Sequence, residues 1–520
     1  MPYNSGKYAN YNSYICGQSP AGKRKARMNI KARRRIFISL IPILVLMGLL
    51  ALNVSIFGTD ALSGASQVAL LFSTAVCCIL SRAFFGTRWS EFEKAIGSSI
   101  GGIAHIILLL LLIGALGGTW TMSGVVPTMI YYGVKAISPK VFLVSATLIC
   151  ALVSLMTGSS WTTIATIGIA LLGIGRVQGF SDAVTAGAII SGAYFGDKMS
   201  PMSDTTVMAS SMSGVPIFKH IRFLMTTTVP TLAVTLTIFL ILGLAHTPSG
   251  EGDLEGIRSA IVSRFNISPW LLLIPLATVV MIYRKIPAIV VLAFSAAIAG
   301  VTCLFAQPSV MHEIALPLTG DAGGTKGLFV GLVRTIYDSV GVTTGNPDVD
   351  SLVSSKGMSG MLNTVYLIIC AMFFGGCMQA SGMIRHIASG IIPLTRRRVP
   401  LVATTAATGV ALNAVVSDQY LSIILTSNIF KGIYEKEGHD GKLLGRTIED
   451  SSTVTSVLVP WNTCGMTQAT ILGIPTLTYL PFCFFNLLCP VMTVLMTVIG
   501  TGLGKGKNED KKTDLANGNI

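Results

Sequence analysis

Residues 36–57 read IFISLIPILVLMGLLALNVSIF, a run that contains no charged side chain. A helix needs about 20 apolar residues to cross the hydrocarbon layer of a bilayer, and this run is long enough. Comparable runs recur at 221–245, 286–307 and 478–503. Counted by apolar length, the sequence predicts an all-α polytopic membrane protein with about 10–12 crossings and some half-length or re-entrant pieces.

The composition supports a membrane protein. Of 520 residues, 51% are hydrophobic and 12% are charged, whereas a soluble domain has about 25% charged residues. The net charge of +14 comes largely from clusters at 23–35, 396–398 and 505–512. Basic clusters beside spans are typical of cytoplasmic segments, so both termini are expected in the cytoplasm and the protein in the inner (plasma) membrane. The clusters lack interleaved aromatic residues, which argues against nucleic-acid binding.

The sequence predicts two membrane halves and no enzyme site. Its ten cysteines form no CxxC pair, and no nucleotide motif or nucleophile–base arrangement appears in the spans, so neither a cofactor nor catalysis is expected. The expected organisation is a basic cytoplasmic tail at 1–35, a first half at 36–245, a polar linker at 246–268, a second half at 269–503, and a cytoplasmic tail at 504–520.

Polar interruptions fall at corresponding places in the two halves. Gly, Ser, Pro and Asp break the apolar runs at 158–163 and 196–206 in the first half, and at 413–420, 449–453 and 460–465 in the second. Paired broken segments of this kind indicate a transporter site at the interface of two repeats.

The stretch from Asp197 to Asp204 contains the strongest chemical signal. A charge at membrane depth costs at least about 2.5–3.5 kcal/mol, so these side chains need a polar cavity or a function. Pro201 prevents a continuous helix and predicts unwinding at 198–201. Ser203 or Asp204 would cap the next half-helix. The freed carbonyls and the two carboxylates are oxygen ligands suited to sodium, which predicts an Na+ site at Asp197 and Asp204.

The second half offers similar parts. Pro460 breaks the run, and Asn462 and Thr463 are expected to stand where Asp204 and Thr205 stand. The acidic residues of this half are Glu449 and Asp450, expected near the place of Asp197, and Asp418, which follows Asn413.

Structural roles compete with functional ones. Asp197 and Lys198 could form an ion pair that locks two helices, and Glu449 could lie in a solvated turn close to Arg446. Ser159 and Ser160, next to Gly158, could serve close helix packing, as small residues do in membranes. His105 is expected to be a buried, hydrogen-bonded histidine rather than a proton relay.

Four strings carry a family resemblance. They are TGSSWTTIATIGIAL (157–171), AGAIISGAYFGDKMSPMSDTT (186–206), NAVVSDQYLSIIL (413–425) and EDSSTVTSVLVPWNTCG (449–465). They resemble the signature blocks of the NhaC-type sodium/proton antiporter family, and the resemblance covers residues 36–500. It implies a secondary antiporter of the ion-transporter superfamily, built from inverted repeats with broken helices and re-entrant hairpins.

The resemblance also implies site residues. Asp197, Ser200, Ser203, Asp204 and Thr205 match the first block; Asp418, Asp450, Asn462 and Thr463 match the others. Many members carry Asn after the double Thr, whereas Val207 stands here, which leaves the transported substrate open.

The leading hypothesis is exchange of Na+ for H+, with Asp197 and Asp204 binding the sodium ion and exchanging the proton. Asp450, Asn462 and Thr463 would complete the coordination or bind an organic substrate. The alternative is a sodium- or proton-coupled exchanger of a small organic acid of the malate or lactate type, or of an amino acid. A channel is less consistent with charged, broken helices in two repeats. The expected partners are Na+, H+ and the lipid bilayer, with an organic anion and a homodimer left open.

Overall fold

The computed structural model describes residues 30–57, 64–102, 104–246, 251–284, 286–320, 324–345, 347–391 and 397–500. Most of the expected N-terminal tail and the whole expected C-terminal tail lie outside these ranges. The first helices are α2 (Ile30–Phe57), α3 (Ala65–Phe84), α4 (Trp89–Gly102), α5 (Ala104–Met122), α6 (Val125–Ala136), α7 (Pro139–Thr157), α8 (Ser160–Thr163), the π-helical turn η3 (Ile164–Gly168), α9 (Ile169–Val177), α10 (Asp182–Met199), α11 (Asp204–Ser213) and α12 (Ile217–Ala245).

The second part of the chain is also helical apart from one short ribbon. It comprises α13 (Glu251–Arg264), η4 (Pro269–Leu272), α14 (Leu273–Tyr283), α15 (Ala288–Ala306), α16 (Pro308–Thr319), α17 (Gly324–Tyr337), α18 (Pro347–Leu352), α19 (Ser359–Ala380), α20 (Met383–Ile391), α21 (Arg398–Val416), α22 (Gln419–Lys436), α23 (Gly441–Ile448), η6 (Glu449–Thr453), η7 (Ser456–Leu458), α24 (Thr463–Leu472), α25 (Thr476–Tyr479), η8 (Leu480–Phe482) and α26 (Phe484–Ile499). Strands β1 (Val340–Gly341) and β2 (Ser354–Ser355) pair antiparallel.

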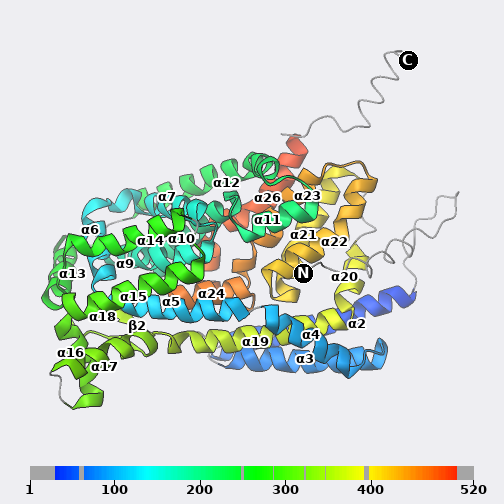
Figure 1. Cartoon of the computed structure of the whole chain (residues 1–520). Coiled ribbons are helices and arrows are strands. Elements are labelled where there is room, and N and C mark those ends of the chain that lie inside the picture. The colour runs from blue at the N-terminus through cyan, green and yellow to red at the C-terminus, as the bar shows by residue number, and fades with distance from the viewer. Residues whose placement is uncertain are drawn as a thin grey trace.

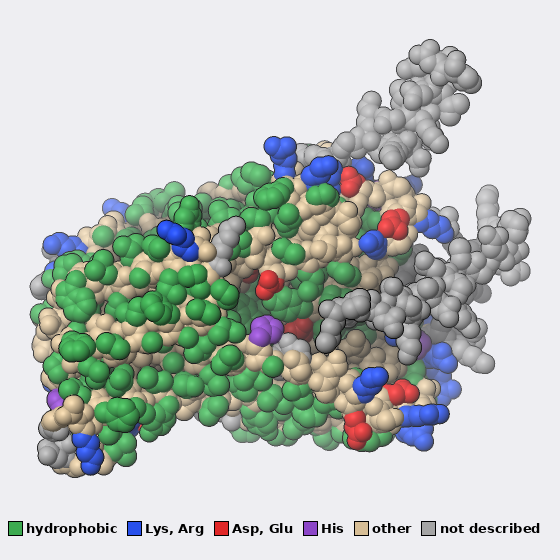
Figure 2. All heavy atoms as spheres, in the orientation of Figure 1, with side chains coloured by type: hydrophobic (Ala, Val, Ile, Leu, Met, Phe, Trp, Pro, Cys, Tyr) green, Lys and Arg blue, Asp and Glu red, His purple; other side chains and the backbone are tan. Residues whose placement is uncertain are grey.

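The helices have the length and surface of membrane spans. In the described ranges nine helices are long and apolar enough to cross a membrane, or up to eleven if each of two bent pairs is one span. Figure 2 shows hydrophobic side chains covering the broad face of the molecule, with Lys and Arg toward its ends. The prediction of an all-α polytopic membrane protein is confirmed.

Several threonine hydroxyls inside these helices donate a hydrogen bond to a carbonyl of the preceding turn. Along α12, Thr231 donates to the carbonyl of Thr227 at 2.7 Å, and Thr235 donates to that of Thr231 at 2.8 Å. A hydroxyl bonded to the preceding turn exposes no unpaired donor, so polar residues persist at membrane depth.

The two halves repeat one another with a constant offset. The bounds of α7 recur 259 residues later as those of α21, and the bounds of α11 recur as those of α24. The helix running from α8 to α9 likewise matches α22. The N-caps follow the same offset, pairing Ser159 with Asp418, Ser181 with Asp440, and Ser203 with Asn462. The structure therefore contains an internal repeat, whose matched elements lie at 139–213 and 398–472.

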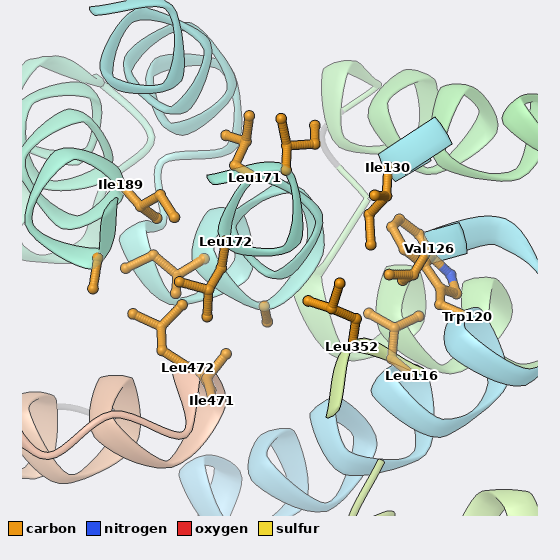
Figure 3. Close-up of a cluster of buried hydrophobic side chains, with 14 of the residues drawn as sticks. Leu116, Trp120, Val126, Ile130, Leu171, Leu172, Ile189, Leu352, Ile471 and Leu472 are labelled. Atoms are coloured by element: carbon orange, nitrogen blue, oxygen red, sulfur yellow. The ribbon is translucent and has the colours of Figure 1, made fainter. Parts of the chain in front are cut away.

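The short helix that follows the break in each repeat packs against the other repeat. From the first repeat, α11 packs on α22 and α23 of the second, whereas α24 of the second packs on η3 and α9 of the first. Figure 3 shows Ile471 and Leu472 of α24 beside Leu172 of α9, in a core that extends to Trp120 on α5. In Figure 1, α3, α4 and α19 run together along one edge of this body. This reciprocal packing brings the interrupted segments of both repeats together.

Candidate functional site

A tight tip joins α7 to α8. Gly158 ends α7 with a φ of 65°, in the left-handed region that favours glycine. Ser159 then caps α8, and its hydroxyl accepts the Thr162 amide at 3.2 Å. A Cβ on Gly158 would lie 2.7 Å from the carbonyl carbon of Met202. The glycine thus lets this tip, residues 157–160, rest directly on the break between α10 and α11.

That break spans residues 200–203, two residues later than the predicted 198–201. Helix α10 continues through Lys198 to Met199, and Pro201 stops it because proline lacks an amide donor. Ser203 caps α11 as predicted, accepting the Thr206 amide at 3.4 Å. The Thr206 hydroxyl donates to the carbonyls of Asp197 and Lys198 at 3.4 and 3.2 Å. Thr206 was not among the predicted site residues, although the double Thr of the motif points to it.

The Asp197 carboxylate lies at the junction of tip and break. It is 7% exposed, and its Oδ2 accepts the Ser160 amide at 3.1 Å and the Ser160 hydroxyl at 2.7 Å. Ser160 is the first residue of α8, so the carboxylate faces a helix N-terminus, where the aligned peptide dipoles favour negative charge.

Asp204, the first residue of α11, differs from Asp197 because it is exposed. The two carboxylates are close enough for their charges to interact. Acidic side chains and a histidine lie in a hollow at the middle of the face drawn in Figure 2. One carboxylate is thus held inside the protein and its neighbour is open to the surroundings.

The second tip and break form a matching junction. Ser417 ends α21 with a φ of 60°, and Asp418 caps α22 by accepting the Leu421 amide at 2.9 Å. The Thr463 amide donates to the Ser417 carbonyl at 2.9 Å, and the Thr463 hydroxyl donates to Asp418 at 3.4 Å. Asn462 caps α24 through the Cys464 amide at 3.1 Å.

The cap positions correct the predicted correspondence by one residue. Asn462 stands in the place of Ser203, not of Asp204, because both residues cap their half-helix; Thr463 is the counterpart of Asp204. The correspondence of Asp450 with Asp197 is also wrong, because the offset of the repeat places Asp450 opposite Ser191.

Backbone carbonyls of the second repeat are held by amide side chains. Asn413 donates to the Ser452 carbonyl at 2.8 Å, and Asn462 donates to the Asn413 carbonyl at 3.0 Å. Gln419, which sequence reasoning left out of the site, donates to the Thr453 carbonyl at 2.9 Å. Asn413 therefore links α21 to η6 and to the cap of α24, and its supporting role in the site stays a prediction.

Lys198 forms an ion pair with Asp450 across the two repeats, not with Asp197. Both side chains are fully buried. The Lys198 ammonium also lies 3.9 Å from the Cys489 sulfur and 5.8 Å from the centroid of the Phe485 ring, both on α26. The alternative of an ion pair between Asp197 and Lys198 is therefore wrong, because the partner of Lys198 comes from the other half of the chain.

Two further predicted environments are wrong. Glu449 is fully buried in the π-helical turn η6, not in a solvated turn. His105 is exposed near the beginning of α5, and it lies close enough to Asp418 for their charges to interact. The sequence around neither residue shows whether another helix packs against it.

The family profile and the most similar relatives reported below include the same kind of protein, Na+/H+ antiporters. The profile of the Na+/H+ antiporter family matches residues 192–501. The Na+/H+ antiporter NhaC of Alkalihalophilus pseudofirmus is 38% identical over 81% of this chain and 88% of its own length. The Na+/H+ antiporter NhaC of Bacillus subtilis is 34% identical over 82% and 91%, respectively. The malate-2H+/Na+-lactate antiporter of Bacillus subtilis is 32% identical over 81% and 86%.

These matches span both repeats and include the two breaks described above. The resemblance inferred from the four motif strings is therefore confirmed. The chain belongs to the Na+/H+ antiporter family, as a multi-pass membrane protein of the NhaC type.

Proposed function

We propose that this protein is a secondary active antiporter that exchanges Na+ for H+ at the junction of tip and break in its first repeat. The observation that carries the proposal is the Asp197 carboxylate, which is buried inside the protein and accepts two hydrogen bonds from Ser160, with the charge of Asp204 near enough to act on it. An acidic residue in such a position is costly, which favours a functional role. Kinship with two NhaC antiporters supports the same activity.

Asp197 and Asp204 are the proposed sodium-binding pair. The exposed Asp204 receives the ion, and Asp197 with neighbouring break carbonyls binds it more deeply. Ser200 and Ser203 shape this break, since Ser200 accepts the Met202 amide at 3.2 Å and Ser203 bonds the Thr205 hydroxyl at 2.9 Å. Because sodium and a proton each neutralise the buried Asp197 carboxylate, one replaces the other, and the exchange is driven by either gradient.

The second repeat contributes the opposing junction. Asp418, Thr463 and Asn462 lie together at this junction, and in our proposal they complete the coordination or bind an organic anion. Asp450 is already paired with Lys198, so we place it outside the sodium-facing group. Both termini are proposed to be cytoplasmic, in the plasma membrane, from the basic clusters near the ends of the chain.

An organic-acid exchanger is the second candidate. The B. subtilis relative named as a malate-2H+/Na+-lactate antiporter is 32% identical to this chain. Val207, at the place where many NhaC-type members have Asn, lies 43% exposed on α11, next to the proposed ion path. Half-helix N-termini at both breaks could hold a carboxylate group.

Everted vesicles loaded with a pH-sensitive dye separate the two functions. A pH change on adding sodium alone would support Na+/H+ exchange. No change with sodium alone, but a response once malate, lactate or an amino acid is also present, would favour the organic-substrate exchanger. Vesicles from cells that lack the protein provide the background.

A further inference from the structure

Glu449 is a buried acid that the proposed ion path does not use. It lies in η6, the π-helical turn that precedes the second break, and its side chain is fully buried. Within the described part of the chain, neither of its carboxyl oxygens has a hydrogen-bond partner, and the second oxygen of Asp450 has none. π-Helical turns occur frequently at functional sites. An ionised carboxylate without a donor is costly in such surroundings.

The charges around Glu449 do not balance. Lys198 and Asp197 on α10 and Asp450 on η6 interact with it electrostatically. Arg446, one turn before, is buried as well; it donates to Thr226, Thr493 and Thr497 and interacts with the charge of Asp450. If every acid here were ionised, two cations would face three carboxylates. The other titratable neighbours from the adjoining helices are Cys489 on α26 and His220 on α12, both near Lys198.

This buried group therefore needs one more monovalent cation, and the geometry indicates where a proton would reside. Asp197 is stabilised as an anion by two hydrogen bonds from Ser160 and by a helix N-terminus. Neither carboxyl oxygen of Glu449 accepts a hydrogen bond within the described residues, and the side-chain hydroxyl near enough to favour its charge is that of Thr453, in place of the two hydrogen bonds that Asp197 receives. A sodium ion would need several oxygen ligands and would be repelled by the Lys198 ammonium, whereas a proton needs neither space nor a coordination shell.

We propose that Glu449 holds the proton that is exchanged for sodium. This inference rests on the proposed function, and it moves the proton from the sodium-binding carboxylates to a second site in the other repeat. When sodium binds at Asp197, the buried group gains a positive charge, and the Glu449 proton leaves. When sodium leaves, the proton returns. The bond that breaks is the O–H of the carboxyl group, and the proton goes to water on the side to which the site is open.

Infrared difference spectroscopy tests the proton site directly. The sodium-free wild-type protein should show the C=O stretch of a protonated carboxyl group, and adding sodium should remove it. Glu449→Gln should lose this band, whereas Glu435→Gln, at an exposed acid on α22, should keep it. Absence of the band in the wild type, or its persistence in Glu449→Gln, would overturn the proposal whether or not sodium is transported.

Calorimetry in buffers of different ionisation enthalpy adds the count of protons released. Sodium binding to the wild type should release about one proton per ion, and binding to Glu449→Gln should release none. Glu449→Asp retains a carboxyl group and should restore the release, which separates loss of the proton from misfolding. If the wild type binds sodium and Glu449→Gln releases as many protons, the inference fails while the proposed function stands. If no sodium binds to the wild type, the proposed function fails and the Glu449 proposal fails with it.

Discussion

The ion pair between Lys198 and Asp450 makes the sharpest energetic prediction. Lys198→Met removes the ammonium but keeps a flexible apolar chain of similar length, so the packing against Phe485 and Cys489 changes little. What changes is the charge: Asp450 remains fully buried on η6 without its partner.

The magnitude follows from the burial of both groups. Removing one partner of a buried pair costs about 3–5 kcal/mol, because the other charge is left uncompensated. Replacing both by apolar residues is often neutral or stabilising by about 1–4 kcal/mol. Lys198→Met should therefore destabilise the protein by several kcal/mol, and Lys198→Met combined with Asp450→Leu should recover most of that loss.

Unfolding in mixed micelles with increasing SDS, followed by tryptophan fluorescence and circular dichroism, measures these differences. A double-mutant cycle isolates the coupling between the two side chains. Equal stability of Lys198→Met and wild type, or a double variant no more stable than the single one, would refute the assignment of a buried pair across the repeats.

Three further predictions concern the first tip and break. Asp197→Asn removes the buried charge that sodium neutralises, so sodium-dependent proton movement in vesicles should vanish while Glu435→Gln behaves like wild type; retained exchange would rule Asp197 out as the sodium ligand. Gly158→Ala should abolish exchange, because the added methyl group would collide with the Met202–Ser203 backbone. The control Gly320→Ala has the same φ of 65° but open space around it, so it should only be destabilised by the backbone cost of about 1–2 kcal/mol. Equal transport by the two variants would contradict the contact between Gly158 and the break. Ser203→Ala should lower stability in mixed micelles by about 1 kcal/mol through loss of the α11 cap, and no loss would show that the cap contributes little.

Much of the fold was predictable because apolar length reports directly on membrane spans. The broken segments were also visible, since Pro201 and Pro460 interrupt otherwise apolar sequence. Of the two predicted caps of α11, Ser203 or Asp204, the structure has Ser203; an N-cap is predictable because it depends on local chemistry. The end of α10 was placed two residues early, since the sequence does not show whether Lys198 and Met199 still complete a helical turn before the proline.

The sequence did not allow us to predict which residues far apart in the chain contact one another. Lys198 and Asp450 lie far apart in the chain, and only the packing of α10 against the second repeat brings them together. The repeat itself has a constant offset, but its residues differ, so Asn462 was matched with Asp204 and not with its true counterpart Ser203. Glu449 and His105 were misjudged for a related reason, since burial depends on which helices cover a position.

The central claim is tested most directly by purified protein in liposomes that contain a pH-sensitive dye, with an inward sodium gradient and no organic substrate. Our account predicts that sodium alone drives protons out of the liposomes, that Asp197→Asn abolishes this movement, and that Glu435→Gln does not. Proton movement that requires a small carboxylate or an amino acid in addition to sodium, or that persists in Asp197→Asn, would contradict it.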